Sequence, residues 1–263
     1  MSIPPVLCYH KVDTRLELGV TRLGPRHFRR QIEALARAGY RSLGAADLLA
    51  LCQGRPSHRE PRTPHLVITF DDGYAALAEH AFPVLADHAM RALVFVITDF
   101  VGRANTWDVQ YGWRAFPHLD WDELGRWQER GIEVHAHGAR HRRLTWLNDA
   151  DAREELGAAR DTIRARLGAA PLALAYPFGA ADARVRQLAS GAGYRLGFAG
   201  AGPASADDPL RLPRLPVYPW DLAGVPFVMQ PGALGVLARW GARTTNRIAV
   251  GTAAFQRLVG TAY

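Results

Sequence analysis

The chain contains very little cysteine and no long apolar run, and both absences narrow what it can be. Cys8 and Cys52 are the only cysteines, so the sequence offers neither a disulfide framework nor a zinc-type cysteine spacing. Its apolar stretches are short or interrupted by arginine, which excludes a membrane-spanning helix. Residues 1–5 lack the basic and apolar segments of a signal peptide. We therefore expect a soluble, cytoplasmic protein.

Lysine is scarce in the chain, and nucleic-acid-binding motifs are missing from it. Lys11 is the only lysine, and the net charge of +7 comes almost entirely from arginine. Since no nucleic-acid-binding motif accompanies this charge, we expect no nucleic-acid partner. A weak attraction to anionic partners, such as phosphate or a membrane surface, is all that the charge indicates. The oligomeric state stays open.

Short apolar runs alternate with helical patterns over most of the chain. The predicted strands are 5–9, 65–70, 91–98, 132–136, 172–176, 195–199 and 211–218, and the predicted helices are 27–39, 75–90, 121–130, 149–167 and 180–192. Repeated strand–helix units predict an α/β fold with a parallel sheet. About seven such strands favour a closed or nearly closed (β/α) barrel. An open doubly wound sheet is the alternative, although no glycine-rich phosphate loop follows the first strand.

The most informative segment is an apolar strand that runs directly into Asp71, Asp72 and Gly73. In parallel α/β folds the carboxyl ends of the strands face the active site. Two neighbouring carboxylates there repel each other unless a cation keeps one of them ionised. A metal at Asp72 would leave Asp71 free to act as a base. The simpler interpretation is a turn, because Asp-Gly is a common turn pair.

Histidines at two other strand ends strengthen the metal hypothesis. His137 and His141 follow the strand 132–136 with a spacing that lets both converge on one ion. His135 shares a strand face with His137 and could be a ligand instead, so the spacing favours 137/141 only mildly. His10 ends the first strand, where it could protonate a leaving group. A histidine held by backbone hydrogen bonds explains His10 equally well.

Aromatic residues supply candidates for substrate binding. Tyr176 and Phe178 stand at another strand end, where their rings would suit stacking on a sugar, although core packing and a rigid turn explain them better without further information. Residues 99–118 form a long loop rich in aromatic residues, which indicates a functional lid or wall in a compact domain. We place Trp107, within this loop, among the substrate-binding candidates.

In combination these segments resemble the polysaccharide deacetylases of carbohydrate esterase family 4, which share the NodB-homology domain. Residues 69–73 look like the first family motif, 137–141 like the second, and 174–179 like the third in its Tyr-Pro-aromatic-Gly form. Residues 212–215 are similar to a late Leu-Pro-Arg-apolar stretch. Residues 7–10 resemble the N-terminal Tyr-His motif of circularly permuted members. The resemblance runs from about residue 5 to 218.

The resemblance implies a role for each matched residue. Asp71 would be the catalytic base, and Asp72, His137 and His141 would bind a divalent metal, with zinc the first expectation. His10 would be the general acid, in place of the C-terminal Leu-x-His of other members. The backbone N–H of Tyr74 would help to hold the oxyanion. The fold would be a distorted (β/α) barrel of about seven parallel strands.

Three positions depart from the family pattern. Gly138 replaces the usual Ser or Thr, so a supporting hydroxyl beside the ligands is lost. Ala175 occupies the place where many members have an arginine that holds the base, and Arg214 could fill that role. His135 stands where glycine is common, which adds a possible ligand or pocket residue. None of these departures removes a member of the Asp-Asp-His-His set.

The sequence thus predicts a metal-dependent hydrolase that removes N-acetyl groups from an amino sugar in a polysaccharide, an oligosaccharide or a lipid-linked sugar. The expected partner is a carbohydrate that carries N-acetylated amino sugars. One alternative is a hydrolase of another acyl group, such as an O-acetyl ester, a formamide or a cyclic amide. The other alternative is a carbohydrate-binding barrel without activity.

The last part of the chain differs from the rest. Residues 222–263 contain no Asp or Glu, and Arg239, Arg243 and Arg247 are spaced to share one helix face. We therefore divide the chain into a catalytic domain, 1–221, and a basic C-terminal helical extension, 222–263. Packing of this extension on the barrel is modestly favoured. The alternative is a basic amphipathic segment that makes peripheral contact with an anionic membrane.

Overall fold

The computed structural model describes residues 3–15, 21–55, 63–106, 115–202 and 208–221, together with Pro226 and Met229. Trp107 and nearly all of the extension 222–263 lie outside these residues, so the predictions made for them stay predictions. The division into 1–221 and 222–263 is likewise a prediction. Within the described ranges, no helix is long and apolar enough to cross a membrane.

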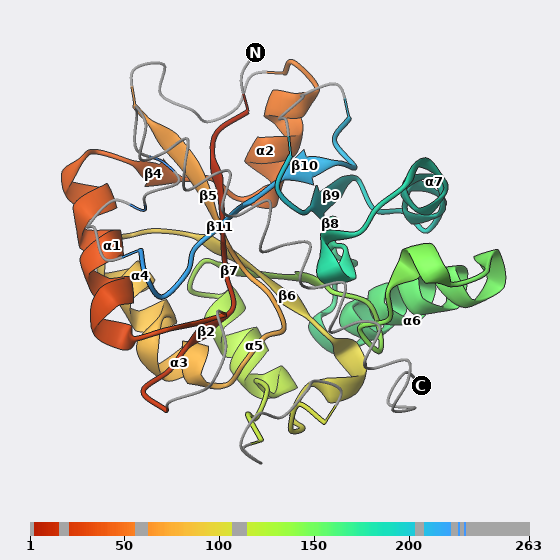
Figure 1. Ribbon diagram of the computed structural model, residues 1–263, viewed down its shortest axis with the longest axis horizontal. Helices are drawn as coiled ribbons and strands as arrows, with labels where there is room; N and C mark the ends of the chain where they lie inside the picture. Colours follow the sequence, from red (N-terminus) through yellow and green to blue (C-terminus); the bar gives the residue numbers. More distant parts are fainter. Residues whose placement is uncertain are drawn as a thin grey trace.

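A parallel sheet occupies the centre of the molecule (Figure 1). Its strands follow the order β10-β9-β8-β7-β6-β5-β1-β11. The strand bounds are β1 Val6–Tyr9, β5 His65–Phe70, β6 Ala92–Val96, β7 Ile132–Ala136, β8 Ala173–Ala175, β9 Leu196–Ala199, β10 Leu212–Pro213 and β11 Leu215–Pro216. Three short strands lie off this path: β4 (Arg41–Ser42) pairs with β5, and β2 (Lys11–Val12) pairs with β3 (Arg22–Leu23).

The sheet closes because its two outermost strands are neighbours in the chain. β10 pairs with β9 and β11 pairs with β1, yet only Arg214 separates them. Taken as one interrupted strand, they complete a barrel of about seven parallel strands, as the sequence predicts. The alternative of an open doubly wound sheet is wrong.

Helices surround the sheet, with α1 and α6 on opposite sides in Figure 1. Their bounds are α1 Pro25–Arg37, α2 Ala45–Cys52, α3 Ala76–His80, α4 Phe82–Asp87, α5 Trp121–Gln128, α6 Asp149–Leu167 and α7 Ala183–Gly191, with 3-10 turns η1 Thr98–Phe100, η2 Leu144–Trp146 and η3 Pro177–Gly179. The predicted helix 75–90 divides next to Pro83, which lacks the N–H that a continuous helix needs. Asp120 begins α5 with a capping box.

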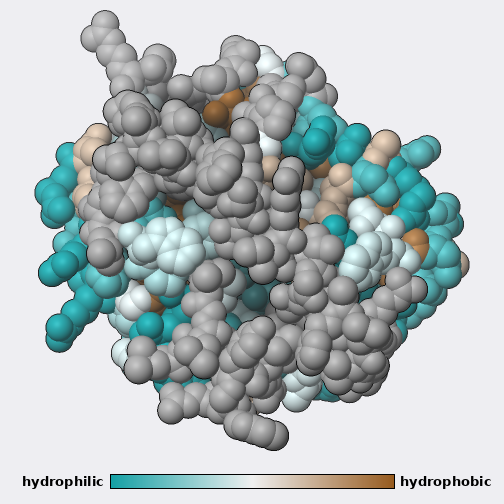
Figure 2. Space-filling model, in the orientation of Figure 1, coloured by the Kyte–Doolittle hydropathy of each residue, from teal (hydrophilic) through white to brown (hydrophobic). Residues whose placement is uncertain are grey.

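The strand residues alternate between two apolar clusters. One alternate set, which includes Ile68 and Val94, packs with helix residues such as Phe28 and Leu156 outside the barrel. The other set, which includes Val67, packs with residues of α2 and fills the barrel interior. The described flanks of the molecule in Figure 2 are mostly hydrophilic. The interior face of the barrel extends to the carboxyl ends of β5 and β7, where the site lies.

Candidate active site

Asp71 follows β5 directly and is held by a buried arginine. Arg214 donates from Nη1 to Asp71 Oδ1 at 2.6 Å and from Nη2 to Oδ2 at 2.7 Å. Both residues are buried. Burial alone would raise the pKa of Asp71, but the charge of Arg214 outweighs it and the pKa lies well below its usual range. Asp71 is therefore a carboxylate throughout the neutral pH range.

Arg214 reaches Asp71 because it interrupts the closing strand of the barrel. Its neighbours on either side belong to β10 and β11, which pair with different strands. The guanidinium lies 5.8 Å from the centre of the Phe95 ring in the barrel interior. This geometry is what the sequence predicts if Arg214, and not a residue at position 175, holds the base.

Asp72, His137 and His141 form a compact buried group. Each offers a ligand atom within 4.8 Å of the other two. Asp72 Oδ1 lies 3.5 Å from His137 Nε2 and 3.8 Å from His141 Nε2. His137 Nδ1 donates to the Ala175 carbonyl at 2.8 Å, which fixes the tautomer and leaves the lone pair of Nε2 directed at Asp72. The structure thus brings together all three predicted ligands.

This group fits a divalent metal. One carboxylate and two imidazoles are a common zinc ligand set. Burial lowers the pKa of His137 and lowers the pKa of His141 further, and a proton on either ring would disfavour a proton on the other. Both imidazoles are therefore neutral and keep the lone pairs that metal binding needs. The separations of 3.5 and 3.8 Å are longer than direct hydrogen bonds and leave room for an ion between the ligands.

Unusual backbone conformations bring these side chains together. Among the described residues, Asp72, Ala89, His141 and Phe178 are the non-glycine residues with positive φ, and all but Ala89 belong to the site. Each such conformation costs about 1–3 kcal/mol and concentrates at functional sites. The Phe178 ring lies 4.7 Å from the His141 ring. The backbone is therefore strained where it turns the ligands inward.

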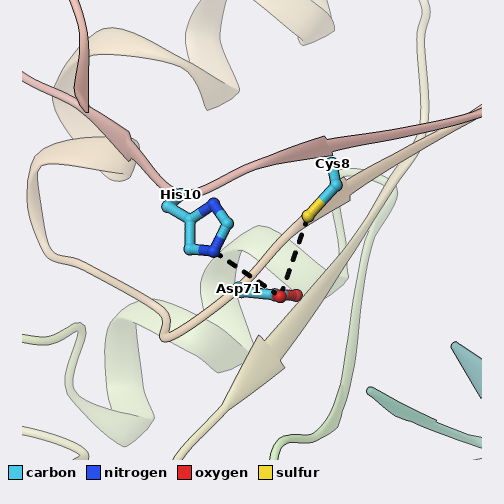
Figure 3. Close-up of side chains that lie close together, drawn as sticks. All are labelled: Cys8, His10 and Asp71. Carbon is cyan, nitrogen blue, oxygen red and sulfur yellow. Dashed lines mark hydrogen bonds and ion pairs between the residues drawn. The ribbon is translucent and has the colours of Figure 1, made fainter. Parts of the chain in front are cut away.

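His10 lies just beyond β1 and approaches Asp71 from a different strand than the metal ligands (Figure 3). Its Nε2 is 3.8 Å from Asp71 Oδ2, and Cys8 Sγ is 3.7 Å from the same oxygen. Burial lowers the pKa of His10 to about 4, although the charge of Asp71 opposes this. At pH 7 the imidazole is neutral. The structure thus places the candidate acid beside the candidate base.

Cys8, His10 and Asp71 form a second compact group of potential ligands, but they suit a metal less well. Arg214 already donates to both oxygens of Asp71. Burial also raises the pKa of the Cys8 thiol, whereas metal binding requires the thiolate. We therefore assign the metal to the group that contains Asp72.

His135 lies within β7 in the barrel interior, further from the carboxyl end of the strand than the proposed metal ligands. Its Nε2 lies 3.4 Å from Glu133 Oε2, and its ring lies 5.9 Å from that of Phe95. The sequence left the pairs 135/137 and 137/141 open. The structure brings the second pair to Asp72, and the alternative with His135 is wrong.

The residues predicted to contact substrate have different surroundings. Tyr176 is completely buried in the outer cluster, and its hydroxyl donates to the Leu210 carbonyl at 2.9 Å. Its assignment to substrate binding is corrected, because alternation along β8 turns its ring toward the helices. Phe178 is half-buried beside His141, so its ring remains available to line the site. Trp107 lies outside the described residues.

Tyr74 follows the two carboxylates and Gly73. The glycine has a φ of 73°, and a Cβ there would come within 2.9 Å of Val96, so the turn requires glycine. The Tyr74 ring is buried and stacks on His118 with ring centres 5.1 Å apart. This packing fixes the backbone of Tyr74 beside Asp72, where its N–H is predicted to hold an oxyanion.

Sequence reasoning missed several residues around the site. Cys8 contacts Asp71, and nothing in the local pattern marks it. His118 stacks on Tyr74, and only its place in the predicted wall 99–118 hinted at a role. Trp220 follows β11 at the carboxyl end of the barrel, is 52% exposed and stacks on Tyr218 with ring centres 4.8 Å apart. The available sequence signal was a tyrosine and a tryptophan close together at the end of the predicted strand 211–218.

Several known proteins are similar to this chain. The Bacillus subtilis (strain 168) protein YxkH, whose name refers to polysaccharide deacetylases, is 25% identical over 194 residues. The match covers 73% of this chain but 63% of YxkH, so the chain spans less than two thirds of that relative.

Two solved structures share the fold over most of the chain. The Streptococcus pyogenes deacetylase PplD, in complex with acetate, superposes with a TM-score of 0.72 and 22% identity, covering 83% of this chain and 93% of PplD. IcaB from Ammonifex degensii gives a TM-score of 0.71 and 22% identity, covering 92% of this chain and 98% of IcaB. At this identity the likeness shows the fold alone. The circular permutation and the Tyr-His motif stay predictions.

The family itself is established by a sequence match. The family model "Polysaccharide deacetylase" matches residues 58–197, which is more than half of the chain. The matched segment contains Asp71, Asp72, His137 and His141. The chain therefore belongs to the polysaccharide deacetylase family.

Proposed function

We propose that the protein is a metal-dependent hydrolase that removes N-acetyl groups from amino sugars. The observation that carries the proposal is the different surroundings of two adjacent carboxylates. Asp71 is paired with Arg214, whereas Asp72 faces two neutral imidazoles. One carboxylate is thus kept charged as a base, and the other has the neighbours of a metal ligand.

Asp72, His137 and His141 would hold the metal, with zinc the first expectation. A divalent ion bound there would supply a Lewis acid that polarises the acyl carbonyl and acidifies a water molecule. The neutral state of both imidazoles favours such binding, because no proton has to leave them. The backbone N–H of Tyr74 would donate to the developing oxyanion.

Asp71 and His10 would move the protons. Asp71 accepts a proton from the attacking water, and Arg214 keeps its carboxylate oriented for this transfer. His10 is neutral at pH 7 because its pKa is about 4, so it must first accept a second proton before it can act as the acid. The 3.8 Å between His10 Nε2 and Asp71 Oδ2 supports a relay in which the water proton passes from Asp71 through His10 to the leaving nitrogen.

The family supports a carbohydrate substrate. Phe178 beside His141, and Trp220 with Tyr218, are the aromatic surfaces near the carboxyl end of the barrel that could stack on a sugar ring. We infer an N-acetylated amino sugar within a polysaccharide, an oligosaccharide or a lipid-linked sugar. That the removed group is an acetyl group on nitrogen is likewise a proposal.

A panel of acyl substrates tests this function. The metal-loaded protein is incubated with N-acetylated amino-sugar oligomers, lipid-linked amino sugars, O-acetylated sugars, formamides and cyclic amides, and mass spectrometry detects the lost acyl group. We expect loss of acetyl from nitrogen. Turnover of another acyl group alone would redirect the assignment. Binding of the oligomers without turnover of any substrate would indicate a carbohydrate-binding barrel instead.

We also propose, from the sequence of residues 222–263 alone, that the extension brings the protein to an anionic membrane. Its charge is exclusively positive, and Leu237, Trp240 and Phe255 lie beside its arginines. Full-length protein should sediment with anionic liposomes at low salt and less at high salt. A full-length variant with Arg239, Arg243 and Arg247 changed to Gln should bind less. If the wild type and the variant both stay in the supernatant with anionic liposomes at low salt, the membrane proposal is wrong.

A further inference from the structure

The loop 137–141 carries two of the three proposed metal ligands, so its shape determines the site. His137 opens the loop directly after β7, and His141 closes it with a positive φ of 59°. Two carbonyl groups of the loop accept hydrogen bonds from the segment that follows β6. Thr98 N donates to the Gly138 oxygen at 3.3 Å, and Asp99 N donates to the Ala139 oxygen at 3.0 Å. The amide groups need a separate partner.

Glu155 supplies that partner from α6, the next α-helix along the chain. It lies on the buried face of α6 between Ala152 and Leu156, where a carboxylate is unexpected. Its Oε2 accepts hydrogen bonds from the backbone N–H groups of Ala139 and Arg140, each at 3.0 Å. Its Oε1 accepts from Arg140 Nε at 3.0 Å. These bonds offset part of the cost of burying this carboxylate, which is fully buried and whose pKa burial still raises.

Gly138 and Glu155 fit each other. Gly138 has a φ of 80°, and a Cβ at this position would come within 3.2 Å of Glu155 Oε2. The glycine therefore leaves the space through which the carboxylate reaches the loop. Sequence comparison with the family motif suggested that Gly138 removes a supporting hydroxyl, and in this chain the support comes from Glu155 instead.

We infer that Glu155 is a positioning residue that sets the metal affinity of the site by holding the loop 137–141 in its ligating shape. This inference rests on the proposed metal site for its effect on affinity. The hold on the loop itself involves only residues of the chain and can be observed without metal. The single oxygen that accepts both amide hydrogen bonds is the critical atom.

Three variants of the full-length protein separate this role from folding. Glu155→Ala removes the acceptor. Glu155→Gln keeps an amide oxygen able to accept both backbone hydrogen bonds but loses the charge and the acceptor for Arg140 Nε. Glu154→Ala is the matched control, because Glu154 is exposed, adjacent and also paired with Arg140 but is not bonded to the loop amides. Gly138→Ala disturbs the same contact from the loop side and replaces Glu155→Ala if that variant does not fold.

Two measurements are made on each variant. Zn²⁺ affinity is measured by competition with a chromophoric chelator, and amide hydrogen exchange at 139 and 140 is measured in metal-free protein. Glu155→Ala should lose about 10–100-fold in Zn²⁺ affinity, the usual cost of losing a residue that orients a ligand, and should exchange faster at both amides. Glu155→Gln and Glu154→Ala should stay close to wild type in both measurements.

Wild-type Zn²⁺ affinity in folded Glu155→Ala, or an equal loss in Glu155→Gln, would overturn the inference. Unchanged amide exchange in Glu155→Ala would overturn it as well. Failure of the wild type to bind Zn²⁺ would count against the proposed function instead, and the exchange rates would still decide whether Glu155 holds the loop. The two ideas can therefore fail separately.

Discussion

Asp71 and Asp72 are neighbours in the chain, yet their surroundings are opposite. Asp71 receives two short hydrogen bonds from Arg214, a permanent cation. Asp72 lies 3.5 and 3.8 Å from the Nε2 atoms of His137 and His141, which burial keeps neutral. A positive φ of 69° at Asp72 turns its side chain away from that of its neighbour. His137 Nε2 also lies 3.8 Å from Asp71 Oδ2, but Arg214 donates to Asp71, so the two identical side chains differ in their principal partner.

The difference indicates how the two roles are divided. A carboxylate that already has a cation stays ionised without a metal, and it can serve as a base because its geometry is fixed. A carboxylate among neutral imidazoles has the surroundings in which a divalent ion gains most. Because Arg214 already donates to both oxygens of Asp71, Asp72 is the carboxylate that we propose for the metal.

The largest expected effect is on turnover. Asp71→Asn should reduce kcat by roughly 10²–10⁴-fold on the true substrate, because it removes a positioned proton acceptor. The metal content should stay that of the wild type, since Asp72, His137 and His141 are unchanged. Steady-state kinetics together with metal analysis of the same sample measure both. Near-normal turnover in this variant would show that Asp71 is not the base.

The next effect is on stability. Arg214→Met should lower the free energy of unfolding of the metal-free protein by about 3–5 kcal/mol, because it leaves the buried carboxylate of Asp71 without its cation. Denaturant unfolding measures this change. The control is Arg153→Met, which breaks an exposed pair with Asp149 and should cost about 0.5 kcal/mol or less. Similar losses of unfolding free energy in both variants would mean that the buried Arg214–Asp71 pair stabilises the protein no more than an exposed ion pair does.

A smaller effect concerns the buried histidine that stacks on Tyr74. His118 is buried, and burial lowers its pKa to about 4. Between the unfolded pKa of about 6.5 and this value the unfolded chain binds more protons. The stability of metal-free protein should therefore fall as the pH falls from 6.5 to 4, by up to about 1.4 kcal/mol per pH unit for this histidine. His118→Phe, which keeps a stacking ring, should show a shallower pH dependence. If the stability of both proteins depended on pH in the same way, the lowered pKa of His118 would be contradicted.

The sequence predicted the local elements around the site because their signals are local. The strands 65–70 and 132–136 and the helix 149–167 have the predicted bounds. Their apolar runs are followed at once by turn residues or capping side chains. The ligand spacing at 137–141 is likewise visible in a short window, which is why the metal group could be proposed.

What the sequence could not predict depends on depth and on long-range contact. Tyr176 and Ala175 alternate along one strand, and the pattern does not say which of them faces the barrel interior. His135 and His137 share that face, but only the fold places one at the strand end and the other a layer deeper. The pairing of Arg214 with Asp71 spans 143 residues. It could be suggested from the family resemblance, but only closure of the barrel explains it.

The most direct test of the division between the two carboxylates is a Zn²⁺ titration of Asp71→Asn and Asp72→Asn side by side by isothermal calorimetry. Each variant removes one negative charge from adjacent positions, so each serves as the control for the other. The structure predicts that Asp71→Asn binds one ion as the wild type does and that Asp72→Asn loses the site. Equal binding in both variants, or loss only in Asp71→Asn, would contradict the assignment of Asp72 to the metal and Asp71 to the proton.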